Sequence, residues 1–275
     1  MLDRRQWLAW IPGMTLLPSL AWRTMFGSAR AEVERTSLPG VVSGRVRDNL
    51  VVAENQRPGT RQWMLEKTRI DPATRYRCPW IEGYVSHASI EAGESIQFFV
   101  STNPASNFTI EIFRLGYYNG DGGRSIAQLG PFQGVVQPDP PIGEKRLRDC
   151  AWSVSAEWMV PEDAVSGVYV GKLTEATEGL QSYVIFVVRD GRPADLIFQC
   201  SDHTWHAYNR WPKQFSLYDD GTHEWYWGGN VEVSFNRPYG KYCQIMDQPL
   251  SIGSGDFFIL EFPFVFWLEQ HGYDI

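Results

Sequence analysis

The sequence predicts two domains of different class, an all-β immunoglobulin-like sandwich followed by the start of an α/β domain. Short segments with period-two alternation of apolar and polar residues fill positions 81–188. An apolar run at 194–198 is followed by helical spacing at 261–270. The length of 275 residues also exceeds that of a usual single domain. We therefore place the sandwich at 79–190 and the first part of the α/β domain at 191–275.

Residues 1–31 predict an export signal. Arg4 and Arg5, followed by an apolar stretch over 8–22, are typical of a twin-arginine signal, and Ala29 and Ala31 form a small-x-small cleavage site. Proline and glycine interrupt the stretch, which is shorter than the roughly 18 residues of a spanning helix, so we expect no stable membrane anchor. The mature protein is then periplasmic or secreted. The alternative is a cytosolic protein with an amphipathic N-terminal extension.

Composition limits the remaining partners and redox chemistry. Residues 32–78 are polar and rich in turn signals, which predicts an extended linker or arm. The net charge of −7, without a basic block after the N-terminus, gives no reason to expect a nucleic-acid partner. In an oxidising compartment the four cysteines allow two disulfides in three pairings, and the sequence does not choose among them. They are Cys78, Cys150, Cys200 and Cys243.

The sandwich elements follow from alternating segments that end at Gly, Asn or Asp. Strands are predicted at 81–86, 95–100, 108–114, 152–158, 168–173 and 182–188, with a hairpin corner at 116–123. Seven or so strands over about a hundred residues are typical of an immunoglobulin-like sandwich.

The second domain opens with a predicted buried strand at 194–198 that leads into a polar, aromatic loop. The helix at 261–270 is expected to bury Phe264, Trp267 and Leu268, to end at Gly272, and to lead into another strand at 273–275. A right-handed crossover of this kind begins a flavodoxin-like or glutamine-amidotransferase-like domain. A two-stranded parallel sheet has bare edges, so we expect the chain to be a fragment of a longer protein.

The loop after the first of these strands is the candidate site. Positions 202–210 contain two histidines, an acid, a tyrosine, an asparagine and an arginine. Ligands of open α/β sheets bind beyond the carboxyl ends of the strands. The alternative is an aromatic loop that caps a domain interface. A second tyrosine lies at 233–240, and a trivalent metal can hold a tyrosine as phenolate.

Residues 195–209, 234–239 and 264–274 together resemble the C-terminal catalytic region of the large, β-type subunit of N,N-dimethylformamidase, and 113–123 resembles the sandwich that precedes it. The resemblance implies a mononuclear Fe(III) held by two tyrosines and a glutamate, and hydrolysis of a small formamide to an amine and formate. Tyr208 and Tyr239 match the tyrosine ligands. The glutamate motif has no match, because Glu224 precedes the second tyrosine. The resemblance therefore predicts an amidohydrolase whose present fragment is inactive.

His206 and Asn209 are the candidate catalytic residues beside these ligands, as general base and as a group that orients the tyrosine loop or a carbonyl. A loop histidine bonded to backbone is the alternative for His206 and for His203, and Arg237 reads equally as a structural ion-pair partner. The implied partners are a small amide substrate and a small second subunit or further copies of the chain. An alternative function is that of an exported, non-catalytic sandwich that binds carbohydrate or a cell-envelope partner through its aromatic loops.

Overall fold

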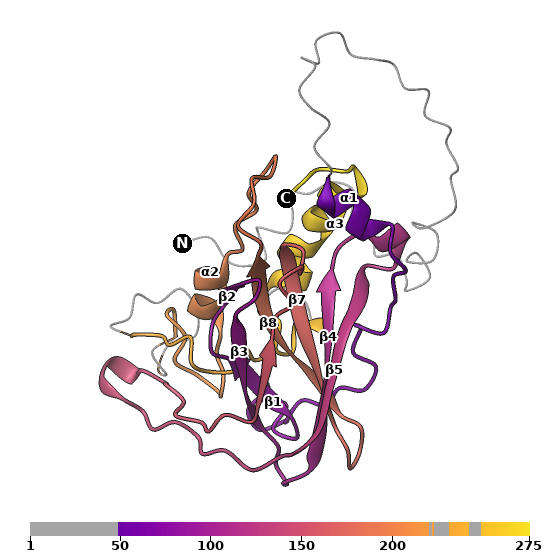
Figure 1. Ribbon diagram of the computed structural model, residues 1–275. Helices are drawn as coiled ribbons and strands as arrows, with labels where there is room; N and C mark the ends of the chain where they lie inside the picture. Colours follow the sequence, from indigo (N-terminus) through magenta and orange to yellow (C-terminus); the bar gives the residue numbers. More distant parts are fainter. Residues whose placement is uncertain (1–48, 220–221, 223–230, 242–248) are drawn as a thin grey trace, which may run out of the picture. The chain divides into compact units, whose positions relative to one another are not determined.

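Two β-sheets form the centre of the protein (Figure 1). The computed structural model describes residues 49–219, 222, 231–241 and 249–275. These residues belong to the second of two units, Arg47–Ile275. The predicted export signal, the first part of the predicted linker, Glu224 and Cys243 lie outside the described residues.

The smaller sheet has three antiparallel strands in the order β1 (Glu82–Val85), β3 (Ser95–Ser101) and β6 (Ala156–Met159). The larger sheet has five strands in the order β2 (Ser89–Glu91), β8 (Gln181–Arg189), β7 (Gly167–Glu175), β4 (Asn107–Leu115) and β5 (Gly123–Gln133). Within it, β2 runs parallel to β8 and the other pairs are antiparallel. This arrangement agrees with the predicted β-sandwich.

The main core lies between the two sheets because alternate side chains point inward. On β3 the fully buried positions are Ile96, Phe98 and Val100, and the residues between them are partly exposed. The facing side chains include Phe108 and Ile110 of β4. Period-two alternation in the sequence therefore predicts this core correctly.

The outer face of the five-stranded sheet is also covered. Phe113 on β4 and Tyr183 on β8 are fully buried, although they point away from the main core. They pack with Trp63, which precedes the sandwich, and with Trp205 and Phe257, which follow it. The strands β7 and β8 are accordingly buried along most of their length.

The segment after β8 forms short helices. They are α2 (Asp202–Tyr208), the 3₁₀ turn η5 (Pro249–Ser251), the π-helical turn η6 (Phe257–Glu261) and α3 (Phe262–Gln270). The predicted helix is confirmed, and Gly272 follows it with a φ of 76° and donates its N–H to the carbonyl of Glu269. The predicted buried face is wrong in part, because Phe264 is 51% exposed and Trp267 is 44% exposed.

The predicted strand at 194–198 is not present. Two successive amides, those of Asp195 and Leu196, both donate to the carbonyl of Asp274, at 3.0 and 3.1 Å, and the side chain of Ile197 is 95% exposed. A strand needs a ladder of backbone partners on a neighbouring strand, and a single shared carbonyl does not provide one. No strand occurs after β8 in the described residues, so the α/β domain is not confirmed.

The end of the predicted linker differs from an extended arm. It contains α1 (Leu50–Asn55), and Trp63 donates its indole N–H to the carbonyl of Asp121 at 2.9 Å. The indole also stacks on Phe258 with ring centroids 5.2 Å apart. These contacts bury apolar surface that polar sequence context alone does not reveal. The remaining 3₁₀ turns are η3 (Tyr118–Gly120) and η4 (Glu144–Arg146).

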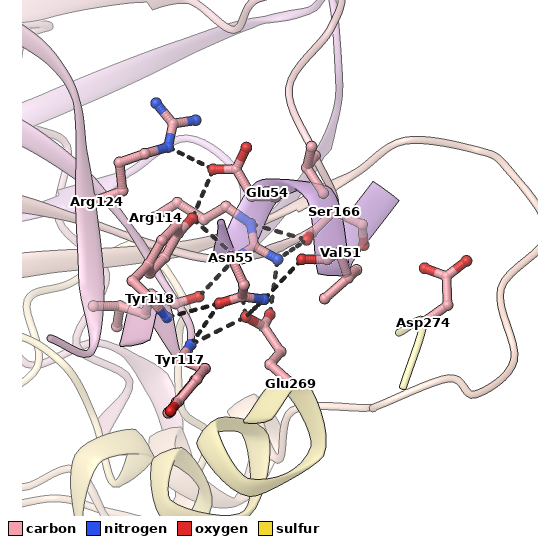
Figure 2. Close-up of polar contacts among 12 residues, drawn as sticks. Val51, Glu54, Asn55, Arg114, Tyr117, Tyr118, Arg124, Ser166, Glu269 and Asp274 are labelled. Atoms are coloured by element: carbon pink, nitrogen blue, oxygen red, sulfur yellow. Dashed lines mark hydrogen bonds and ion pairs between the residues drawn. The ribbon is translucent and has the colours of Figure 1, made fainter. Parts of the chain in front are cut away.

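A buried polar network fastens α3 to the sandwich and to α1 (Figure 2). Arg114 of β4 pairs with Glu269 of α3 at 2.8 Å, and both side chains are buried. The other carboxylate oxygen of Glu269 accepts hydrogen bonds from the Asn55 amide, at 2.8 Å, and from the backbone N–H of Tyr117, at 3.2 Å. Nothing in this network is left to bind a ligand, so we assign it a structural role.

Candidate functional site

The helix α2 carries three of the four predicted site residues or their neighbours, where the sequence predicts a loop. Its start is fixed by Glu261, whose carboxylate accepts hydrogen bonds from the backbone N–H of Ser201, at 3.1 Å, and from the indole of Trp205, at 2.9 Å. Trp205 and His206 are thereby turned into the protein, while His203 stays exposed beside Asp202.

His206 is enclosed between two aromatic rings. Its ring centroid lies 4.2 Å from that of Phe235 and 4.3 Å from that of Tyr239, and the side chain is 3% exposed. The Nδ1 atom has no hydrogen-bond partner among the described residues. Burial, and then the positive charge of Arg237, lowers the pKa of His206 well below its ordinary value. The imidazole is therefore neutral at pH 7.

Asn209 has a positioning role. Its amide donates to the carbonyl of Pro238 at 2.9 Å, and its carbonyl oxygen accepts from the N–H groups of Trp211 and Gly240, both at 3.1 Å. The two residues on either side of Tyr239 are thus bound by the residue that follows Tyr208. These bonds already use the amide of Asn209, so it is better suited to hold the tyrosine segment than to bind substrate.

Arg237 reinforces the same junction and is not an ion-pair partner. The guanidinium donates to the carbonyls of Ser234, Trp211 and His206, at 3.2, 3.1 and 3.0 Å. The residue is 1% exposed, and burial lowers its pKa to about 10. No described carboxylate pairs with it, so the structural ion pair suggested by the sequence is absent from this part of the chain.

The two tyrosines occupy adjoining segments but different environments. Tyr239 packs against Trp205, with centroids 6.1 Å apart, and against His206. Tyr208 packs against Tyr218 at 4.9 Å, and within the described residues no ring contact joins it to Tyr239. The structure therefore brings the backbone segments of the two tyrosines together without pairing their rings.

Carboxylates lie on one side of Tyr239. Burial, followed by the charges of Asp202 and Asp256, raises the pKa of Tyr239 well above its ordinary value, while Arg237 acts in the opposite direction. Asp256 itself is buried, and burial together with the charge of Glu261 raises its pKa to about 7. A negative surrounding of this kind disfavours a free phenolate and favours a cation beside it.

A cavity of about 50 Å³ lies between β1, β8, α2 and the segment around Tyr239. His206, Arg237 and Tyr239 reach it from one side, and apolar residues of the sandwich, including Val184 and Ile185, form the other side. The site thus lies where the sandwich meets the segment that follows it, which is a common place for small-ligand sites.

Several residues considered at the sequence level lie elsewhere or pair differently. Arg210 binds Asp219 at 2.5 Å and the hydroxyl of Tyr76 at 2.6 Å, so its role is structural. Cys78, Cys150 and Cys200 are free thiols. The described residues contain no group of three His, Cys, Asp or Glu side chains able to hold a metal, and no helix among them is long and apolar enough to cross a membrane.

Sequence reasoning missed Asp256 and the cavity. Asp256 lies in a Gly-Ser-Gly-Asp context that reads as an ordinary turn, so only its burial beside Glu261 and Tyr239 distinguishes it.

A family model described as N,N-dimethylformamidase beta subunit-like, C-terminal, matches residues 109–275. The match covers more than half of the chain and includes both tyrosines, His206, Asn209 and Arg237. No curated protein matches the sequence.

Proposed function

The chain belongs to the N,N-dimethylformamidase beta subunit-like family, and from this premise we propose that it carries part of an iron-dependent hydrolase that cleaves the C–N bond of a small amide. Tyr208 and Tyr239 are the proposed ligands of a mononuclear Fe(III). His206 is the proposed proton acceptor, and Asn209 is the residue that positions the second tyrosine. An exported immunoglobulin-like sandwich is the scaffold in this proposal.

The observation that carries the proposal is the junction of the two tyrosine segments. Asn209 follows Tyr208 directly and binds the backbone on both sides of Tyr239, at 2.9 and 3.1 Å. Arg237 adds bonds from the second segment to the carbonyls of His206 and Trp211. Two segments about thirty residues apart in sequence are therefore held as one unit. A metal site needs this kind of fixed support behind its ligands.

The residues present fit a cation of high charge. Phenols are ligands that such an ion converts to phenolates, and the carboxylates of Asp202 and Asp256 already place negative charge near Tyr239. A ferric ion held there supplies polarisation of an amide carbonyl and acidification of a water molecule.

The chain's own residues contribute the rest of the chemistry. The neutral imidazole of His206 presents an unpartnered Nδ1, which accepts a hydrogen bond from the attacking water. The rings of Phe235 and Tyr239 hold this imidazole in place and exclude bulk solvent from it. The apolar walls of the adjoining cavity strengthen electrostatic interactions with a polarised carbonyl.

The test is metal analysis and electronic absorption of the purified protein. We expect iron near one equivalent and a visible phenolate-to-iron charge-transfer band. Tyr208→Phe and Tyr239→Phe should each abolish or strongly shift this band. Tyr218→Phe is the matched control, because Tyr218 lies against Tyr208 but is not a proposed ligand, and it should leave the band intact.

The outcomes separate the two tyrosines and the two functions. A band that survives Tyr208→Phe but not Tyr239→Phe removes Tyr208 from the ligand set. Protein that takes up no iron but binds glycans supports the alternative of a carbohydrate-binding or envelope-binding sandwich.

A further inference from the structure

We infer that the cavity beside Arg237 and His206 is a binding site for a small monovalent carboxylate of the size of formate or acetate. The guanidinium of Arg237 is the charge partner in this site, and His206 provides a second polar contact. The inference does not depend on iron, since it rests on the charge, the burial and the volume of the cavity.

The first argument is the missing counter-charge. Three arginines of the described residues are deeply buried, namely Arg114, Arg210 and Arg237, with exposures of 0, 7 and 1%. Arg114 pairs with Glu269 at 2.8 Å, and Arg210 pairs with Asp219 at 2.5 Å. Arg237 is bonded to carbonyl oxygens alone. Carbonyls satisfy hydrogen bonds but not the net charge, and a buried unpaired charge is costly.

The second argument is the donor capacity that remains. A guanidinium has five N–H groups, and three are used by the carbonyls of Ser234, Trp211 and His206. Arg237 lines the cavity, so an anion there can take up the remaining capacity. The unpartnered Nδ1 of His206, on a side chain that is 97% buried and lines the same cavity, gives a second polar contact when this nitrogen carries the proton.

The third argument is the size and lining of the cavity. A volume of about 50 Å³ accommodates roughly three or four non-hydrogen atoms, since one water needs about 10–15 Å³ of the same measure. Of the described residues that line it, Arg237 alone carries a full charge at pH 7. The remaining walls are largely backbone, aliphatic and aromatic groups, including Val184, Ile185 and Phe235. These features select a small anion with one charge over a phosphate or a larger acid.

The experiment is a calorimetric titration of chelator-treated protein with sodium formate, with sodium chloride at equal concentration as the reference. We expect saturable binding of formate and of acetate, weaker binding of butyrate because of its size, and a rise in the unfolding temperature beyond that caused by chloride. Arg237→Gln should weaken formate binding about tenfold or more, which is the scale of one lost charge-assisted bond. Arg148→Gln is the matched control, because Arg148 is also partly buried but does not line the cavity.

A second variant covers the possibility that Arg237→Gln fails to fold. Ala88→Leu adds a side chain at the cavity wall without touching Arg237 or His206, and it should block formate while leaving circular dichroism unchanged. Formate that acts no better than chloride overturns the inference, as does undiminished binding by folded Arg237→Gln or Ala88→Leu. Because the protein is metal-free in this experiment, its outcome is separate from the presence or absence of the iron band.

Discussion

Asp256 is an acid whose surroundings oppose its charge. Burial and the neighbouring Glu261 raise its pKa to about 7 from an ordinary value near 4. The folded protein therefore binds this proton more tightly than the unfolded chain does. The stability it contributes is complete below about pH 4 and is lost as the pH rises toward 7.

We expect Asp256→Asn to stabilise metal-free protein in a pH-dependent way. The variant should match the parent near pH 4 and exceed it by on the order of 1–4 kcal/mol at pH 8, since one pKa unit corresponds to about 1.4 kcal/mol. Thermal unfolding of both proteins between pH 4 and 8 measures the difference. Asp71 gives a control of opposite sign, because backbone bonds from Ala73 and Thr74 lower its pKa. A parallel pH dependence of parent and Asp256→Asn would show that Asp256 is ionised without cost.

At the same scale, sequence alone identifies Tyr208, His206, Asn209 and Tyr239 as candidates, because chemistry-bearing side chains are dense in two short stretches. It does not reveal that Asn209 clamps the residues beside Tyr239, since such bonds depend on the path of both segments. Nor does it show that Arg237 lacks a carboxylate. Pairing of a charge is a property of the folded neighbourhood and has no local signature.

The attachment of α3 to β4 depends on a single buried ion pair with further hydrogen bonds (Figure 2). Glu269→Gln removes the negative charge and leaves Arg114 buried without a counter-ion, at a side-chain exposure of 0%. We expect a loss of about 3 kcal/mol or more in the free energy of unfolding, the usual cost of breaking a buried pair from one side. Urea denaturation followed by tryptophan fluorescence measures this loss.

Glu178 provides a matched control for that substitution. It also pairs with an arginine through both oxygens, Arg69 at 2.9 and 2.6 Å, but the pair lies at the surface. Solvent screening reduces such pairs, so Glu178→Gln should hardly move the denaturation midpoint. Equal effects of the two substitutions would mean that burial does not set the strength of the Arg114 pair.

Elements with clear alternation and their own partners could be predicted, as β3, β4, β7 and β8 show. The strand β5 could not, because Gly130 and Pro131 interrupt its pattern, and only its place at the sheet edge lets the proline be accommodated. The apolar run at 194–198 failed for the converse reason. It has the composition of a strand, but the described residues offer it one shared carbonyl in place of a neighbouring strand.

For the molecule as a whole, the five-stranded sheet is covered on both faces, and the outer cover comes from residues on either side of the sandwich in sequence. The segment that holds the candidate site is therefore part of the same hydrophobic structure as the sandwich. Phe257 in the outer layer and Phe98 in the inner core are both 0% exposed, which makes them a matched pair.

We expect Phe257→Ala and Phe98→Ala each to cost about 3–5 kcal/mol, the usual loss for truncating a buried phenylalanine. Unfolding should stay a single transition, with coincident curves from far-ultraviolet circular dichroism and tryptophan fluorescence. A separately folding outer layer would behave differently. Phe257→Ala would then shift only an early fluorescence change and leave the main dichroism transition where it is in the parent. Coincident, equally displaced curves for both variants would instead mean that the support of the candidate site cannot unfold without the sandwich.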